Sequence, residues 1–153
     1  MHHVAPGMPT LSPYLIVHDA EAAIAFYGKV LGATERMRIA GPQGKVMHAE
    51  IAIGDAVVML ADPFPEMGYR SATDIGATPV SLMLYVPDAD ATIIAAQEAG
   101  AEIMKPAADQ FWGDRMGTIR DPFGHVWSLA TCKEPVPPDE VTRRAAEWSQ
   151  KAG

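Results

Sequence analysis

The sequence contains an internal repeat whose period is close to half of its length. Residues 17–33 read VHDAEAAIAFYGKVLGA, and residues 86–101 read VPDADATIIAAQEAGA. Asp19 and Asp88 lie 69 positions apart, and the same offset relates Ala20 to Ala89, Glu21 to Asp90, Ala22 to Ala91 and Ile24 to Ile93. A fixed period of this size predicts two copies of one structural unit. The 153 residues are therefore expected to form a fold with two equivalent halves.

The first half reads as a strand, a helix and then further strands. Residues 12–17 (SPYLIV) are a short β-prone run, and Asp19 is a favourable residue for a helix N-cap. Apolar side chains at helical spacing follow, and Gly32 ends the predicted helix. Turn residues at 41–44 and 54–55 then separate three β-prone segments. This order predicts a βαβββ module.

The second half repeats the plan, with a predicted helix from Asp88 to Gly100. Its closing strands are followed by prolines and acidic residues, a pattern typical of the start of a helix. The predicted organisation is a flexible N-terminal arm at 1–10, one domain at 11–132 with modules at about 11–62 and 78–132, a linker at about 63–77 and a helical tail at 133–153.

Composition and charge narrow the range of functions. Hydrophobic residues make up 48% of the chain and charged residues 20%, which is typical of a globular protein. A net charge of −7 disfavours nucleic acid as a partner and favours cationic small ligands. The single Cys132 excludes an internal disulfide. Because we find neither a secretory start nor an apolar stretch of transmembrane length, we expect a cytoplasmic protein that does not bind membranes.

Five segments together carry the pattern of a known family. They are SPYLIV-x-D, HAEIAIGDAVVMLAD, SLMLYVPD, DQFWGDRMGTIRDPFGHVWSLAT and PPDEVTRRAA. From about residue 10 on, the chain resembles the vicinal oxygen chelate superfamily, which includes glyoxalase I, extradiol dioxygenases and bleomycin-resistance proteins. It is most similar to the PhnB-like, glyoxalase/bleomycin-resistance branch. The resemblance implies an α+β fold in which two βαβββ modules form a curved mixed sheet around a cleft, usually within a homodimer.

The resemblance also implies four positions for metal ligands, one on the first strand and one on the last strand of each module. In this chain these positions are occupied by Ser12, Met59, Ser81 and Ser128. Enzymes of the superfamily typically have histidine, glutamate or glutamine there. Three hydroxyls and a thioether are not a ligand set for zinc, nickel, manganese or iron. We therefore expect no metal cofactor at the usual site, which leaves open whether the protein is an enzyme.

His48 and Glu50 offer an alternative. If Gly54-Asp55 is a two-residue hairpin turn, Glu50 pairs with Met59, and His48 and Glu50 both point into the cleft. A three-residue turn would shift the register by one residue and turn both side chains away. Inside the cleft, the pair could bind one divalent metal ion, or Glu50 could act as a catalytic base. His48 and Glu50 could equally form a hydrogen-bonded pair that orients a ligand, or one that only satisfies the hydrogen-bonding groups of the two side chains.

Strand alternation assigns further residues to the cleft. Methionine is deformable and contacts aromatic rings well, so Met59 and Met83 could touch a planar ligand, although methionines also fill irregular cores. Phe111 and Trp112 could form a wall of the cleft. They could equally cover the hydrophobic core or lie in a dimer interface. The expected ligand-binding residues are Ser12, Tyr14, His48, Glu50, Met59, Ser81, Met83, Tyr85, Phe111, Trp112 and Ser128.

Three further features bear on the chemistry and the closure of the cleft. Asp114-Arg115 could bind a polar group of a ligand or form a structural ion pair. Cys132 is predicted to lie past the last strand with nothing to activate it. Phe64, Met67 and Tyr69 in the linker are positioned to act as a lid over the cleft.

Three hypotheses for function follow. The leading one is a metal-free protein that binds, and thereby sequesters, a small aromatic or cationic organic molecule, with an antibiotic as one example. The alternative is an enzyme (a lyase, isomerase or dioxygenase) that uses His48 and Glu50 with a divalent metal ion, or Glu50 alone as a base. The third is a dimeric scaffold whose cleft is vestigial. Open sheet edges favour a homodimer in each case.

Overall fold

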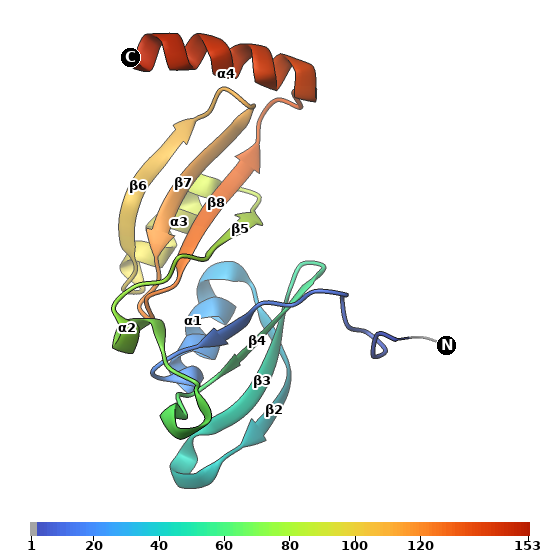
Figure 1. The fold of residues 1–153 in the computed structure, drawn as a ribbon, viewed down its shortest axis with the longest axis vertical. Coiled ribbons are helices and arrows are strands. Elements are labelled where there is room, and N and C mark those ends of the chain that lie inside the picture. Colours follow the sequence, from blue (N-terminus) through green and yellow to red (C-terminus); the bar gives the residue numbers. More distant parts are fainter. Residues whose placement is uncertain (1–2) are drawn as a thin grey trace. The chain divides into compact units, whose positions relative to one another are not determined.

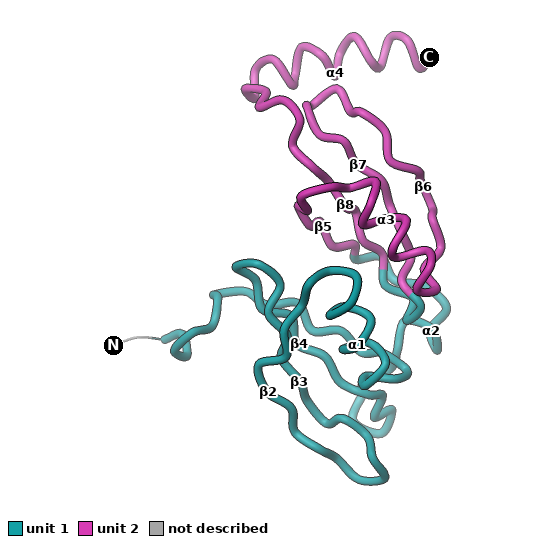
Figure 2. The backbone as a smooth tube through the Cα atoms, turned by 180° about the vertical axis from the view of Figure 1, so that it is seen from behind, with its two compact units in different colours: residues 1–80, 122–125 teal, residues 81–121, 126–153 magenta. Residues whose placement is uncertain are grey.

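The computed structural model describes residues 3–153, so the first two residues of the predicted N-terminal arm lie outside the described residues. The chain divides into two compact units (Figure 2). Unit 1 comprises residues 1–80 and 122–125, and unit 2 comprises residues 81–121 and 126–153. Each unit contains one copy of the sequence repeat.

Both units have the element order βαβββ that the repeat predicts (Figure 1). Unit 1 contains β1 (Tyr14–Ile16), α1 (Ala20–Leu31), β2 (Thr34–Ala40), β3 (Val46–Ile53) and β4 (Ala56–Ala61), followed by the short helix α2 (Ala72–Ile75). Unit 2 contains β5 (Ser81–Tyr85), α3 (Ala89–Glu98), β6 (Glu102–Asp109), β7 (Asp114–Arg120), β8 (Val126–Cys132) and the C-terminal helix α4 (Pro138–Ala152). The prediction of an α+β fold with a terminal helix is confirmed.

The strands form two four-stranded mixed sheets, with the orders β1-β4-β3-β2 and β5-β8-β7-β6. In unit 1 the parallel pair β1–β4 aligns Tyr14 with Met59, and in unit 2 the pair β5–β8 aligns Met83 with Ser128. Both members of these pairs are related by the 69-residue offset of the sequence repeat. The register of the two sheets therefore follows the repeat.

Helix caps explain where the two long helices of the modules begin and end. Asp19 accepts a hydrogen bond from the backbone N–H of Ala22, and Asp88 accepts one from Ala91, as the sequence predicts. Helix α1 ends at Gly32, which adopts φ 68°, a left-handed conformation that glycine tolerates well. Helix α3 ends slightly before the predicted Gly100, at Glu98, because the cap backbone N–H already bonds to carbonyls of the last turn.

One face of each sheet packs against its helix and forms the core. In unit 1, Tyr27 of α1 is fully buried, as are Ile51 and Leu60 of the sheet. In unit 2 the corresponding buried sheet residues are Ile119 and Leu129. Alternation along the strands places polar and half-exposed side chains on the opposite face of each sheet. These opposite faces carry the candidate sites.

Two local predictions need correction. The first strand covers only Tyr14–Ile16: Pro13 has no N–H to donate, although its carbonyl accepts from Met59 N at 2.9 Å. Within the predicted linker, Ser71 caps the short helix α2 by accepting a hydrogen bond from the backbone N–H of Asp74. Cys132 is the last residue of β8 and not a residue beyond it, because it pairs with Asp114 of β7.

Candidate functional site

The hairpin β3–β4 decides where His48 and Glu50 point. Ile53 pairs with Ala56, so Gly54-Asp55 is the two-residue turn, and Gly54 has φ 57°. Glu50 consequently pairs with Met59, as predicted. Because β1 aligns Tyr14 with the same Met59, the side chains of Tyr14, His48 and Glu50 meet on one face of the unit 1 sheet.

A chain of polar contacts joins these three side chains. Tyr14 Oη and His48 Nδ1 are hydrogen-bonded at 2.8 Å, and His48 Nε2 lies 3.6 Å from Glu50 Oε1. Burial, and then the neighbouring Tyr69, raises the pKa of the Tyr14 phenol. Tyr14 therefore remains protonated at neutral pH, so its hydroxyl keeps a hydrogen and stays hydrogen-bonded to His48.

Sequence reasoning missed Arg36, which completes this cluster. Its Nη1 lies 3.7 Å from Glu50 Oε2 and also donates to the sulfur of Met8 at 3.2 Å. Arg36 occupies a register shift between Glu35 and Met37, so simple alternation along β2 cannot assign its side chain to a face. Tyr69 of the linker stacks on Tyr14, with 6.2 Å between ring centroids and 6° between planes.

The predicted linker lid of Phe64, Met67 and Tyr69 is only partly in position over this face. Phe64 is buried, Met67 is largely exposed, and Tyr69 is the one of the three that contacts a site residue.

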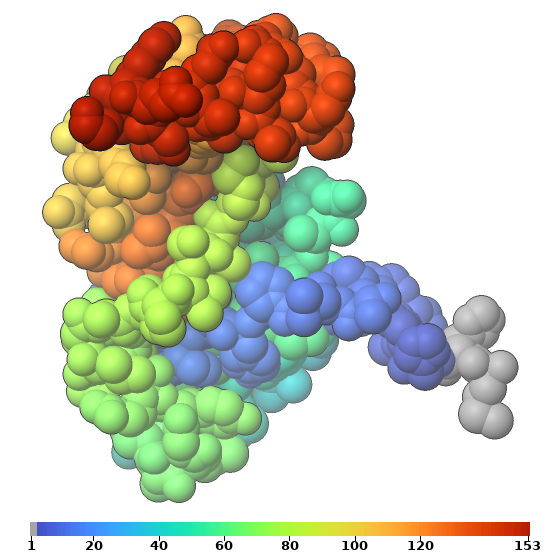
Figure 3. All heavy atoms as spheres, turned by 45° about the horizontal axis from the view of Figure 1, so that its top comes forward, coloured from blue at the N-terminus to red at the C-terminus, as the bar shows by residue number. Residues whose placement is uncertain are grey.

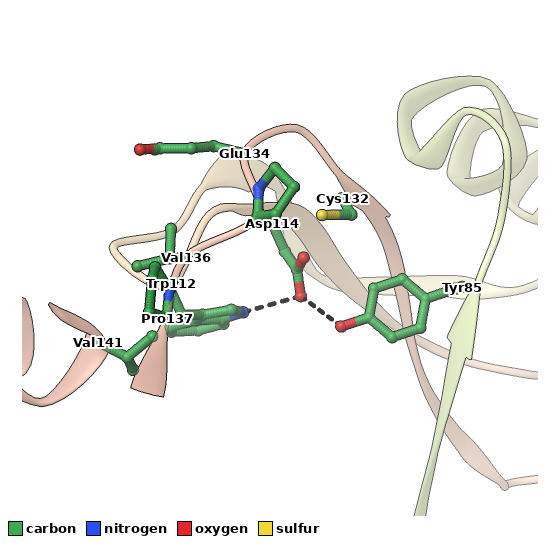
Figure 4. A pocket seen from close by; sticks show the side chains of 9 residues that line it. Tyr85, Trp112, Asp114, Cys132, Glu134, Val136, Pro137 and Val141 are labelled. Carbon is green, nitrogen blue, oxygen red and sulfur yellow. Dashed lines mark hydrogen bonds between the residues drawn. The ribbon is translucent and has the colours of Figure 1, made fainter. Parts of the chain in front are cut away.

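Unit 2 contains an open cavity of about 570 Å³. Its lining residues are Tyr85, Trp112, Asp114, Cys132, Glu134, Pro135, Val136, Pro137 and Val141 (Figure 4). One carboxylate oxygen, Asp114 Oδ2, accepts hydrogen bonds from Tyr85 Oη at 2.9 Å and from Trp112 Nε1 at 3.0 Å. Asp114 is only 5% exposed. The cavity thus has a largely buried carboxylate between two aromatic side chains.

Local backbone structure explains this convergence. Tyr85 is the last residue of β5 and Asp114 is the first residue of β7, while Trp112 lies in the turn between β6 and β7. Gln110 N donates to Asp114 O at 2.7 Å and closes that turn. At Gly113 the carbonyl of Glu134 occupies the space that a Cβ would need, so only glycine allows the chain after β8 to approach the turn.

The pKa values of two groups around the cavity are shifted in defined directions. The hydrogen bond to Asp114, and then burial, raises the pKa of the Tyr85 phenol, so Tyr85 stays a neutral donor. Hydrogen bonds from Arg144 lower the pKa of Glu134, which is therefore a carboxylate at neutral pH. Arg115 does not enter the cavity, because its guanidinium pairs with Asp90 and Asp109. For Asp114-Arg115 the sequence left open a polar contact with a ligand or a structural ion pair. Arg115 forms structural ion pairs, with Asp90 and Asp109.

The remaining predicted residues are distributed over both units. Phe111 lies outside the cavity, with its ring 4.9 Å from Trp112 and 5.9 Å from Trp148 of α4. Ser128 Oγ lies 3.5 Å from Thr118 Oγ1. The residues Ser12, Tyr14, His48, Glu50 and Met59 belong to unit 1, whereas Ser81, Met83, Tyr85, Phe111, Trp112 and Ser128 belong to unit 2.

The residues at the four superfamily ligand positions do not fit a divalent metal ion. Ser12 lies before β1, and its Oγ is buried without a hydrogen-bond partner among residues 3–153. Met59 and Ser128 supply a thioether and a hydroxyl, and Ser81 supplies another hydroxyl. Within the described part of the chain, no group of three or more His, Cys, Asp or Glu side chains is placed to hold a metal ion.

Two βαβββ units with the same strand order and register define a class of proteins that are built from two equivalent modules. A family model shows which family of this class the chain belongs to. The chain belongs to the Glyoxalase/Bleomycin resistance protein/Dioxygenase superfamily, whose model matches residues 1–129.

Individual proteins show the same relationship. The chain is 46% identical over 148 residues to Uncharacterized protein Mb0911c of Mycobacterium bovis, covering 95% of this chain and 96% of that protein. The crystal structure of TioX from Micromonospora sp. ML1 has a TM-score of 0.61 and 25% identity, covering 84% of this chain and 100% of that one. A PhnB protein from Bacillus cereus shares the fold, with a TM-score of 0.65 at 17% identity over 80% of this chain and 99% of that chain.

Across residues 3–153, none of the helices has the length and apolar character required to span a membrane.

Proposed function

We propose that this protein binds a small organic cation that carries an aromatic ring, holds it in the unit 2 cavity without a metal ion, and so sequesters it. The observation that carries the proposal is the single Asp114 oxygen hydrogen-bonded to both Tyr85 and Trp112. The hydrogen bonds orient the carboxylate and the two rings relative to one another. Both hydrogen bonds are made to Oδ2, and neither involves Asp114 Oδ1.

The chemistry of the cavity favours a cation over a neutral or anionic ligand. A carboxylate that is 5% exposed is poorly solvated and gains from a positively charged partner. The faces of tyrosine and tryptophan also attract cations and stack on aromatic rings. Glu134 is a second carboxylate in the lining, paired with Arg144, and the chain as a whole has a net charge of −7.

The biological role that we propose is removal of a toxic compound, such as an antibiotic that combines an amine with an aromatic ring. Membership of a superfamily whose description includes bleomycin-resistance proteins supports this role. Placement in the PhnB-like branch is part of the same proposal. It is supported by the sequence segments quoted above and by the shared fold of the Bacillus cereus PhnB protein.

The proposal predicts that proflavine, a planar aromatic cation, binds and that anthracene-2-sulfonate, a planar anion, does not. Isothermal titration calorimetry with Asp114→Asn should show an affinity at least about tenfold weaker, because a charge-assisted contact is lost. Asp109→Asn removes an exposed carboxylate of unit 2 outside the cavity and should leave the affinity unchanged. Dialysis against a chelator should also have no effect.

Equal binding by wild type and Asp114→Asn, or loss of binding after the chelator treatment, would contradict the proposal. So would the absence of binding or thermal stabilisation by any member of a panel of aromatic cations.

A second candidate function is favoured by the polar contacts on unit 1. We propose as the alternative an enzyme in which Glu50 removes a proton from an activated C–H group, with His48 and Tyr14 in support. The contacts at 2.8 Å and 3.6 Å link the three side chains in one row. A metal-dependent version would have only His48 and Glu50 as protein ligands at this position, so the contacts favour Glu50 as a base.

A further inference from the structure

Helix α4 contributes to the wall of the unit 2 cavity but is only lightly attached. None of its 15 residues is buried, and the space-filling view shows it as a ridge whose visible side is open to solvent (Figure 3). Val141 lines the cavity, and Trp148 rests against Phe111. Because so little apolar surface is buried, polar contacts largely decide whether α4 stays in place.

One arginine makes the polar attachments between α4 and the rest of unit 2. Arg144 donates to both carboxylate oxygens of Glu134, at 3.1 and 2.9 Å, and to the carbonyl oxygen of Phe111 at 3.2 Å. The neighbouring Arg143 pairs with Glu140 and Glu147, which are both in α4. Exposed ion pairs are individually weak and are screened by salt, so the Arg144 contacts can break and reform readily.

The segment before α4 has the properties of a hinge. The backbone N–H groups of Lys133 and Glu134 both donate to Gly113 O, at 2.9 and 3.0 Å, and hold the chain as far as Glu134. Residues 135–137 have no regular structure and lead directly into the helix. The prolines in this segment fix φ, so α4 can move only by rotation about the few backbone torsions that remain free. Val136 and Pro137 line the cavity and would move with the helix.

We propose that α4 is a movable lid at one side of the ligand cavity, held in the observed position by Arg144 and released when Arg144 leaves Glu134 and the Phe111 carbonyl. The inference rests on the proposed function, because a lid has a role only where the cavity holds a ligand. Opening would also leave Glu134 as an unpaired carboxylate in the lining. The released state would attract a cation, and the return of α4 would bring Val141 back to the wall of the cavity beside the bound ligand.

The test compares Arg144→Gln with Arg143→Gln. The second variant removes the same charge from the same helix but leaves the contacts between α4 and the rest of unit 2 in place. In stopped-flow binding of proflavine, Arg144→Gln should raise both the association and the dissociation rate by roughly 5- to 20-fold, with a much smaller change in affinity. Arg143→Gln should leave both rates near those of wild type. Added salt at about 0.5 M should accelerate the dissociation of proflavine by a larger factor in wild type than in Arg144→Gln, because only wild type has the Arg144 contacts for salt to screen.

Hydrogen exchange of the ligand-free protein tests the lid independently of any ligand. Backbone amides of residues 138–150 should exchange roughly 5- to 20-fold faster in Arg144→Gln than in Arg143→Gln. Equal exchange in the two variants would overturn the lid, as would an unchanged dissociation rate of proflavine in Arg144→Gln. If proflavine and the other cations fail to bind while exchange rises as expected, the lid survives and the proposed ligand is wrong.

Discussion

Glu50 lies between a histidine and an arginine on the exposed face of the unit 1 sheet, 3.6 Å from His48 and 3.7 Å from Arg36. A carboxylate in this position can act as a base, or it can serve only to balance the charge of Arg36. The repeat offers an internal comparison, because sheet register pairs Glu50 with Met59 and Thr118 with Ser128. Unit 2 thus has a threonine where unit 1 has this acid.

The enzyme alternative predicts a specific loss in Glu50→Gln. Wild type should catalyse exchange of deuterium from D2O into the α C–H groups of small α-hydroxyketones, followed by proton NMR. Glu50→Gln should reduce that rate by at least about 100-fold, since a general base contributes about that much, while the melting temperature changes little.

Glu35→Gln is the matched control for this measurement. It removes an equal charge from β2, where Glu35 pairs with Arg38 away from His48. If wild type catalyses no exchange, or if Glu50→Gln exchanges as fast as wild type, Glu50 is not a base.

At the scale of elements, the attachment of α4 should depend on pH. Hydrogen bonds from Arg143, and then Arg144, lower the pKa of Glu140 from its usual 4.5 to about 2. Arg144 also lowers the pKa of Glu134. A depressed carboxyl pKa stabilises the folded state above the ordinary pKa, and this stabilisation is lost as pH falls through the lowered value.

The attachment depends on Glu134, because the two arginines that pair with Glu140 belong to α4 itself. We therefore expect α4 to detach as the pH falls below about 4.5 and through the lowered pKa of Glu134. The measurement is the tryptophan fluorescence of wild type minus that of Trp148→Phe, which reports the contact of Trp148 with Phe111. In Arg144→Gln the transition should be largely absent, because the helix is already released. A signal that stays constant down to about pH 2.5, or an identical transition in Arg144→Gln, would contradict this expectation.

At the scale of the whole molecule, both sheets end in unpaired strands. The edges are β1 and β2 in the first sheet and β5 and β6 in the second. Met37 on β2 and Met104 on β6 are large apolar side chains exposed at these edges. Unpaired strand edges with exposed apolar side chains can pair with or be covered by another chain. These features support the proposal of a homodimer.

Light scattering coupled to size exclusion should accordingly give twice the 16.4 kDa mass of one chain. Met37→Lys and Met104→Lys should shift the protein towards the monomer, because a charge at the edge of a sheet opposes pairing. Met67→Lys is the control, since Met67 is equally apolar and exposed but lies outside both sheets. A monomeric mass for wild type at micromolar concentration would rule out the dimer.

The sequence by itself determined the two modules and their helix caps. Periodicity and capping are local properties, so they can be read from neighbouring residues alone. The turn length, and with it the face of β3 that carries His48 and Glu50, was decided by the structure, in which Ile53 pairs with Ala56. Because equivalent residues of the two modules are 69 positions apart, an element predicted in one module predicts the equivalent element in the other. The same offset relates Ser12 to Ser81 and Met59 to Ser128, the residues at the four superfamily ligand positions.

Only the tertiary structure decided which side chains converge. Tyr85 and Asp114 are 29 positions apart, Arg144 and Glu134 are 10 apart, and Arg36 reaches Glu50 through an irregular strand. No periodic pattern predicts these contacts, because they depend on how β5, the β6–β7 turn and the segment after β8 are brought together by non-local strand pairing. The same pairing placed Cys132 in the cavity and Phe111 outside it. Local chemistry specified the modules, whereas the packing of distant segments built the sites.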